Sequence, residues 1–216
     1  MAMVNLPQLP LVWIDCEMTG LNPDNDVILE IYCFITDGQL NLVKMGQSVD
    51  GVKLDKDETE RECPGWGAII HVPKERLDLM DSWCTDHHGR SGLTEAVLKS
   101  SVTHEEAADG LLAYIRQYIP KPRLGLLAGS SVHADKAFLR RAPYDRVMDH
   151  LHYRILDVST IKEAVRRWQP RVPEGEDVPK KDKVQHKESK HRARDDILDS
   201  IAEARRYKRM LFDQGN

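Results

Sequence analysis

Residues 11–21 read LVWIDCEMTGL, an apolar run that ends in two acids and a turn. Leu11–Cys16 consists mostly of strand formers, and the Thr-Gly pair beginning at Thr19 marks the end of a strand. Residues i and i+2 of a strand point to the same face, so Asp15 and Glu17 are predicted to stand side by side. The stretch therefore predicts a strand that presents two carboxylates where it ends.

The paired acids have two interpretations. Neighbouring carboxylates without a partner cation repel each other and lose hydration when buried, and a divalent metal ion would relieve both costs. Alternatively, the strand end emerges into solvent, where acids are common. Taken alone, the pair leaves both interpretations open.

The segments that follow predict a three-strand antiparallel meander. Val27–Asp37 (VILEIYCFITD) is mostly apolar, and Gly38 makes a tight link to a third expected strand over Leu40–Val49. From Gly51 to Gly67 the chain is charged and contains Gly and Pro, so we interpret residues 51–70 as an inserted loop.

Helices and strands alternate in the rest of the chain. Residues 170–189 are rich in Pro, Lys and Glu and read as a mobile linker. We predict a single domain over residues 1–216 with an α/β fold: a mixed sheet, made of the antiparallel meander plus parallel strands, with helices on both faces. Helices are expected at Pro73–Trp83, Thr94–Lys99, His104–Tyr118, Ala134–Arg141, Thr160–Trp168 and Ala193–Phe212, and strands at Leu124–Ala128 and Tyr153–Val158.

Composition narrows the class of protein. Hydrophobic residues make up 41% and charged residues 31%, as in soluble globular proteins, and no apolar run approaches the roughly 20 residues of a membrane span. Residues 1–10 lack the features of a signal or transit peptide, so we expect none. Four cysteines without a CxxC pair argue against a zinc site and a disulfide framework, which fits a reducing intracellular compartment.

The formal net charge of −4 bears on nucleic-acid binding. Proteins that grip long nucleic acids usually carry a basic surface, because neutralised phosphates supply most of the affinity. Either this protein does not bind nucleic acid, or its nucleic-acid ligand is small.

Two further acids stand at predicted helix starts. Asp135 lies in GSSVHADKAFL, after an apolar strand, and Asp196 closes the segment HRARDD that begins at His191. Acids are favoured at helix N-termini by the helix dipole, which is a sufficient explanation of each one alone. Asp195 and Asp196 are adjacent and face different directions, so at most one of them is expected to join a site.

Together these motifs resemble a known family. The order D-x-E, a distant Asp after a strand, then H-x4-D resembles the DEDDh exonuclease superfamily, which has an RNase H-like fold. The segments WIDCEMTGL, LDLMDSW, HYRILDVSTIKEAVRRW and HRARDDILDSIAEARRY resemble oligoribonuclease, and the resemblance runs from about Leu11 to Leu211. The segments VHAD and HYRILDVST are closest to the eukaryotic members.

The resemblance implies a 3′→5′ exoribonuclease that hydrolyses short oligoribonucleotides, chiefly dinucleotides, to 5′-mononucleotides. It implies that Asp15, Glu17, Asp135 and Asp196 hold two Mg²⁺ or Mn²⁺ ions, and that His191 is the general base. Carboxylate oxygens suit hard divalent ions, and an imidazole titrates in the range needed to deprotonate an attacking water.

The resemblance also implies contacts to the substrate. Two of the residues involved also have a purely structural explanation: Trp83 could equally be a core aromatic residue instead of a substrate contact, and Arg154 could be a surface cation. The implied roles are Leu21 as a wedge between the two bases, Trp83 and His88 near the bases and phosphate, Ser131, Arg154 and Ser159 as a cap on the 5′ phosphate, and Tyr153 from the other subunit of a homodimer.

Some questions stay open at this point. Residues 51–70 and 170–189 depart from the compact bacterial pattern, and eukaryotic members occur in mitochondria and cytosol, so the compartment is unresolved. One alternative is a DEDDh exonuclease acting on longer RNA or DNA, against which the acidic net charge argues. Another is a non-catalytic nucleotide-binding protein, against which the presence of all five catalytic residue types argues.

Overall fold

A mixed five-stranded sheet forms the centre of the protein. The computed structural model describes residues 8–43, 65–169 and 192–213, and the sheet in these ranges has the order β3-β2-β1-β4-β5. β1 and β3 both pair antiparallel with β2, whereas β4 pairs parallel with β1 and with β5. The strands are β1 (Leu11–Met18), β2 (Ile28–Thr36), β3 (Trp66–Ile69), β4 (Leu126–Gly129) and β5 (His152–Asp157).

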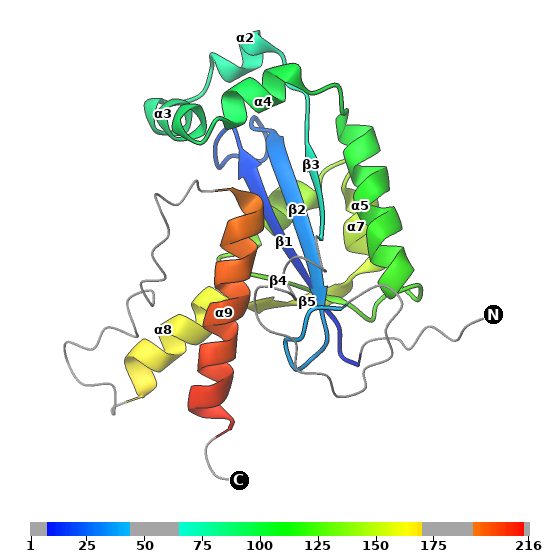
Figure 1. Ribbon diagram of the computed structural model, residues 1–216, viewed down its shortest axis with the longest axis vertical. Helices are drawn as coiled ribbons and strands as arrows, with labels where there is room; N and C mark the ends of the chain where they lie inside the picture. Colours follow the sequence, from blue (N-terminus) through cyan, green and yellow to red (C-terminus); the bar gives the residue numbers. More distant parts are fainter. Residues whose placement is uncertain (1–7, 44–64, 170–191, 214–216) are drawn as a thin grey trace.

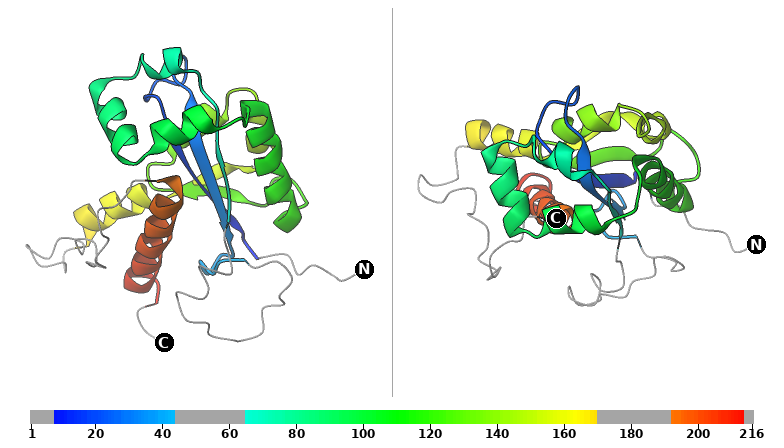
Figure 2. Two further views of the ribbon diagram at one scale, coloured as in Figure 1. Left: turned by 45° about the horizontal axis from the view of Figure 1, so that its top comes forward. Right: turned by 90° about the horizontal axis from the view of Figure 1, so that it is seen from above.

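Helices cover both faces of this sheet (Figure 1 and Figure 2). α5, α6 and α7 contribute to one hydrophobic core, and α8 and α9 contribute to a second core on the opposite face. The helices are α2 (Lys74–Leu77), α3 (Ser82–Arg90), α4 (Leu93–Lys99), α5 (His104–Tyr118), α6 (His133–Leu139), α7 (Asp145–His150), α8 (Val158–Trp168) and α9 (Ala193–Leu211).

The alternation along β1 assigns its side chains to these two cores. Val12 and Ile14 belong to the core under α5, whereas Leu11 and Trp13 belong to the core under α9. Successive strand residues point to opposite faces, so Asp15 continues the row that α9 covers. The sheet therefore directs its acids towards the beginning of α9.

The third strand of the meander lies elsewhere than expected. The sequence predicted it over Leu40–Val49, but residues 40–43 make only one isolated bridge, between Thr36 and Leu42, and residues 44–49 lie outside the described ranges. The strand that pairs with β2 is instead β3 at Trp66–Ile69, inside the segment interpreted as an inserted loop. Asp37 accounts for the turn, because its carboxylate accepts the backbone N–H groups of Gln39 and Asn41.

The expected helix over 73–83 is two helices, α2 and α3. Asp81 separates them, because its side chain accepts the N–H of Cys84 and so caps a new helix. The helix His104–Tyr118 is confirmed with its predicted bounds, and Thr103 and Glu106 form a capping box at its start. The short helix α7 was not predicted.

Some expectations fall outside the described ranges. They are the interpretation of residues 170–189 as a linker and that of residues 51–64 as inserted loop. Among the helices of the described ranges, none combines the length and the apolar character needed to cross a membrane.

Candidate functional site

Three carboxylates converge where β1 ends and α9 begins. One oxygen each from Asp15, Glu17 and Asp196 lies within 4.8 Å of the others. Figure 1 shows the start of α9 (orange) beside β1, the strand that carries the first two acids. The adjacent Asp195 is 57% exposed in its side chain and contacts Arg194 at 3.3 Å. Of the two neighbouring aspartates, the structure brings Asp196 into the group, as the sequence predicted.

Asp135 approaches the same strand from α6, in whose first turn it lies. Its side chain is buried, and its Oδ1 accepts the backbone N–H of Cys16 at 2.9 Å. Cys16 sits between the two acids of β1, so this bond attaches the carboxylate to the middle of the D-x-E motif. The four predicted acids are thus brought to one place from three separate segments.

Burial raises the pKa values of three of the clustered carboxyl groups, and neighbouring carboxylates add to the rise at two of them. Burial comes first among the causes that raise the pKa of Glu17 to about 8, followed by the carboxylates of Asp196 and Glu30, while Arg192 opposes the rise. Burial also raises the pKa of Asp135 to about 7 despite the N–H of Cys16.

For Asp15 the shift has the same direction. Burial comes first, followed by repulsion from Asp135, Asp196 and Glu17, and together they raise its pKa well above the usual range. Carboxylates that destabilise each other in this way are stabilised by a bound cation.

The donor set fits a hard divalent cation. All the convergent ligand atoms are carboxylate oxygens, which Mg²⁺ and Mn²⁺ prefer. Asp15, Glu17 and Asp196 are the residues that would hold such an ion, with Asp135 beside them. His191, the predicted general base, lies outside the described residues.

Sequence reasoning missed an ion pair beside the acids. Glu30 is 5% exposed and stands directly opposite Glu17 in the β1–β2 ladder. Both of its oxygens accept hydrogen bonds from Arg192, at 2.8 Å from Nε and 2.6 Å from Nη2. The available signal was a single charged residue inside the apolar run Val27–Thr36.

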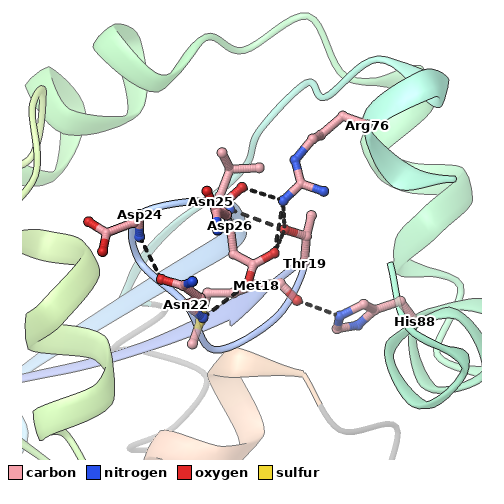
Figure 3. Close-up of polar contacts among 9 residues, drawn as sticks. Met18, Thr19, Asn22, Asp24, Asn25, Asp26, Arg76 and His88 are labelled. Atoms are coloured by element: carbon pink, nitrogen blue, oxygen red, sulfur yellow. Dashed lines mark hydrogen bonds and ion pairs between the residues drawn. The ribbon is translucent and has the colours of Figure 1, made fainter. Parts of the chain in front are cut away.

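The loop after β1 is held by Arg76 of α2 (Figure 3). Its Nη2 donates to Thr19 Oγ1 at 2.9 Å, to Asp26 Oδ1 at 2.8 Å and to Asn25 O at 2.6 Å. Leu21, the predicted wedge, lies in this loop and is 80% exposed. A fixed loop thus presents an apolar side chain three residues beyond the end of β1.

Gly20 is required by the same loop. A Cβ at this position would lie 2.5 Å from the carboxylate of Asp26, which is held by Arg76 and by the N–H of Asn22. The glycine of the TGL segment is therefore required by the packing of this loop against Asp26.

His88 of α3 is buried against the end of β1, at 1% exposure. Its Nε2 donates to Met18 O at 2.9 Å, since only an N–H can contact a carbonyl oxygen in this way (Figure 3). Its Nδ1 lies 3.9 Å from Glu17 Oε2 and has no hydrogen-bond partner among the described residues. His88 therefore belongs to the surroundings of the acids.

Trp83 is 66% exposed, which rules out the core interpretation. Its ring stacks on that of His87 one helical turn later, with centroids 4.6 Å apart and planes at 10°. The pair forms an exposed aromatic surface on α3, the helix that also carries His88.

Ser131 and Ser159 are brought together as predicted, with their hydroxyl oxygens 3.0 Å apart. Asp157 holds both, because its Oδ1 accepts the backbone N–H of each at 2.9 Å. Ser131 has a φ of +54°, a left-handed conformation that costs a non-glycine residue of order 1 kcal/mol and is common at functional sites.

Arg154 and Tyr153 lie on β5, the last strand in the sheet order. Both are exposed, and the Arg154 guanidinium carbon lies 5.1 Å from the centre of the Tyr153 ring. The structure does not show Arg154 in contact with the two serines. Its exposed position over the Tyr153 ring agrees with the interpretation of Arg154 as a surface cation.

Comparison with known proteins connects this geometry to a family. The family model described as Exonuclease (RNase T) matches residues 12–204. The probable oligoribonuclease of Schizosaccharomyces pombe is 44% identical over 206 residues, which is 95% of this chain and 69% of the relative. The mitochondrial oligoribonuclease of Homo sapiens is 44% identical over 202 residues, which is 94% of this chain and 73% of the relative.

Among solved structures, exonuclease I from Methylocaldum szegediense matches with a TM-score of 0.59 and 17% identity. The match covers 95% of this chain and 41% of that chain, so this chain spans less than half of the larger enzyme. At this identity the likeness concerns the fold alone, and it confirms the predicted RNase H-like architecture.

We expect the metal-free protein to lose stability as the pH rises. Glu17 and Asp135 have ordinary pKa values of 4.5 and 3.8 and folded-state values of about 8 and about 7. Between these limits the folded state binds more protons than the unfolded state, so the free energy of unfolding falls with pH. Thermal unfolding in a chelator should show a melting temperature that decreases from about pH 5 to about pH 8.

Mg²⁺ or Mn²⁺ should oppose this decrease, because an ion that binds only the folded state stabilises it. Asp196→Asn should reduce both the pH dependence and the stabilisation by metal, whereas Asp195→Asn should leave both unchanged. A melting temperature that is independent of pH in chelator, and of metal at pH 8, would contradict the interpretation of the acids.

Proposed function

The chain belongs to the RNase T type of exonuclease family and to its oligoribonucleases, and we propose that it is a metal-dependent 3′→5′ exoribonuclease of short RNA. Its preferred substrates are dinucleotides, which it hydrolyses to 5′-mononucleotides. The observation that carries the proposal is the convergence of Asp15, Glu17 and Asp196 within 4.8 Å, with Asp135 attached to the same strand.

The four acids would hold two Mg²⁺ or Mn²⁺ ions. Two such ions stabilise the negative charge on the attacking and leaving oxygens of a phosphodiester during in-line displacement. Asp15 and Glu17 provide oxygens from β1, Asp135 from α6 and Asp196 from α9. Because these elements pack on a common sheet, the ligands are positioned before substrate binds.

The proposed proton transfer assigns His191 as the base. Its neutral imidazole takes a proton from the attacking water, whose oxygen bonds to the phosphorus of the 3′-terminal phosphodiester. The 3′ oxygen of the upstream nucleotide leaves, and a 5′-mononucleotide is released. This role is carried over from the family motif H-x4-D, in which Asp196 is the last residue.

Exposed side chains around the acids would bind the nucleotide. Leu21 would separate the two bases, and Trp83 would lie near the bases. His88 is buried, and it would act near the phosphate from its place beside Glu17. Exposed aromatic rings are suited to stacking on bases, at about 1–3 kcal/mol for each base. The exposure of Leu21 and Trp83 supports these roles, because neither side chain is used in a core.

Ser131, Ser159 and Arg154 would cap the 5′ phosphate of the substrate. Asp157 accepts both backbone N–H groups, and the two hydroxyl groups lie together. One hydroxyl donates to the other, and the second can donate to a phosphate oxygen. Arg154 would have to leave the ring of Tyr153 to complete such a cap.

We propose a homodimer located in mitochondria or cytoplasm. Tyr153 would serve the pocket of the neighbouring subunit, and its exposure on the last strand of the sheet supports this. Light scattering tests the assembly, with about twice the 24.7 kDa chain mass expected. Relatives from Bos taurus and Saccharomyces cerevisiae are named as mitochondrial, and the three described cysteines are unpaired thiols, as in a reducing compartment.

Replacing any proposed ligand should abolish turnover of a dinucleotide. Asp15→Ala, Glu17→Ala, Asp135→Ala and Asp196→Ala each remove a metal-binding oxygen, so kcat should fall by more than the roughly 10–100-fold that loss of an outer-shell partner costs. The measurement is the initial rate of a 5′-phosphorylated dinucleotide with Mn²⁺.

Two variants serve as references in the same series. Asp195→Ala should stay within about threefold of wild type, because its side chain is exposed outside the group. His191→Ala should lower kcat by about 10²–10⁴-fold while keeping the metal-dependent gain in melting temperature. Equal losses at Asp195 and Asp196 would show that the ligand on α9 is misassigned.

A length series should separate this enzyme from exonucleases that act on long strands. Long substrates require a basic channel for their phosphates, but the chain has a net charge of −4. We therefore expect kcat/KM to fall sharply from a dinucleotide to a twenty-nucleotide RNA. Arg154→Ala should weaken dinucleotide turnover by roughly ten- to hundredfold and reduce the length preference.

Arg167→Ala is the matched control, because this exposed arginine pairs with Glu163 and stands eight residues after Ser159, near the end of α8. It should leave the length profile unchanged. If a twenty-nucleotide RNA or DNA is cut as efficiently as the dinucleotide, the protein is an exonuclease of longer nucleic acids.

A further inference from the structure

We propose that Glu30 and Arg192 are positioning residues of the active site. Their ion pair fixes the first turn of α9 and so holds Asp196 against Asp15 and Glu17. The inference rests on the proposed function, because it treats Asp196 as a metal ligand. Neither Glu30 nor Arg192 belongs to the set of acids and base that the motifs define.

The geometry of the pair is that of a rigid contact. The guanidinium of Arg192 meets the carboxylate of Glu30 with two hydrogen bonds, of 2.8 Å and 2.6 Å, from two different nitrogens. A two-point contact of this kind restricts orientation as well as distance. Glu30 is itself fixed, because it lies buried within β2 and opposite Glu17 in the strand pairing.

The backbone transmits this position to Asp196. Arg192 is the N-cap of α9, and its carbonyl oxygen accepts the N–H of Asp195 at 2.9 Å and of Asp196 at 3.2 Å. Asp196 is thus one helical turn beyond the residue that Glu30 holds. A shift of Arg192 would move the first turn, and with it the carboxylate that completes the group of acids.

Glu30 also compensates for a missing cap. The side chain of Arg192 makes no capping hydrogen bond, which leaves the first N–H groups of α9 without the usual partner. The N–H of Ala193 points at Glu30 Oε2, at 3.4 Å, and a carboxylate is favoured at the positive end of a helix. β2 therefore supplies the negative charge that the N-cap residue does not.

The charge balance gives the pair a second role. The four proposed ligands together carry the charge that two divalent ions neutralise, and Glu30 adds a fifth carboxylate beside them. Arg192 neutralises Glu30 and uses both of its oxygens. Without Arg192, an unpaired buried carboxylate would repel the ligands and compete for a metal ion.

If the pair of Glu30 and Arg192 only stabilised the fold, its removal would have a different effect. A buried ion pair that only stabilised the fold would affect the melting temperature but not the folded enzyme. The matched control is Arg146, a partly buried arginine that pairs with Glu105 at 2.7 Å and Asp109 at 2.9 Å between α7 and α5. None of these three residues belongs to the group of acids.

The experiment compares Arg192→Gln, Glu30→Gln, their double variant and Arg146→Gln in the full chain. It measures kcat and KM for a dinucleotide with Mn²⁺, and Mn²⁺ affinity by calorimetry with MnCl₂ alone. Arg192→Gln should lower kcat and weaken Mn²⁺ binding by about 10–100-fold, with KM changed by less than about threefold. The double variant should lose no more than the larger single loss, because the two residues act as a unit.

Arg192→Lys should recover only part of the loss, since lysine keeps the charge but not the two-point contact. Arg146→Gln should lower the melting temperature without changing kcat or Mn²⁺ affinity. If Arg192→Gln behaves like Arg146→Gln, the positioning role is wrong.

A folding defect can be separated from this result. The pair Glu30→Gln and Arg192→Met removes both charges together, a change that buried ion pairs often tolerate. This variant should fold but bind Mn²⁺ more weakly than the wild-type protein does. If its kcat equals that of the wild type, the inference is wrong. Loss of the proposed function has its own signature, because wild-type protein would then neither bind Mn²⁺ nor hydrolyse the dinucleotide, and the inference would fail with it.

Discussion

The repulsion between carboxylates gathered at one end of the sheet is the constraint on which the rest of the structure depends. Burial raises the pKa values of Asp15, Glu17 and Asp135, and repulsion from neighbouring carboxylates adds to the rise at Asp15 and Glu17, so these acids are costly to ionise side by side. Packing elsewhere must offset that cost. β1 lies between two hydrophobic cores, and α9 is anchored in one of them by Ile197 and Ile201 directly after its acids.

The same solution occurs at three of the segments that carry site residues. A carboxylate accepts hydrogen bonds from a distant part of the chain and fixes the segment: Glu30 holds the start of α9, Asp157 joins the turns of Ser131 and Ser159, and Asp26 with Arg76 closes the loop after β1. These acceptors are satisfied by defined donors, whereas the acids at the end of β1 face one another. Glu30, Asp157 and Asp26 thus stabilise the structure of the site, whereas the acids at the end of β1 repel one another and would be stabilised by a bound cation.

How far the sequence could predict this depends on the range of each interaction. Asp15 and Glu17 follow from strand alternation, and helix geometry makes Asp195 and Asp196 face different directions, so local periodicity sufficed. The pair of Glu30 and Arg192 joins residues 162 positions apart and left only a lone acid in an apolar strand as its signal.

The third strand escaped prediction for a related reason. β3 is only four residues long, contains Gly67 and follows a charged segment, so its identity comes from pairing with β2 and not from its own composition. The left-handed Ser131 likewise depends on the N–H contact to Asp157, on another strand. Motif recognition proposed the site residues themselves, but it did not predict the contacts that hold them.

The acidic net charge bears on the kind of ligand that this arrangement can bind. An anionic ligand approaching a protein of charge −4 gains little from long-range attraction, so its binding must come from local contacts. A short RNA suits such a site, because few phosphates need to be neutralised and bound metal ions can neutralise them where the chemistry occurs. A long strand would place further phosphates against a surface without a matching surplus of cations.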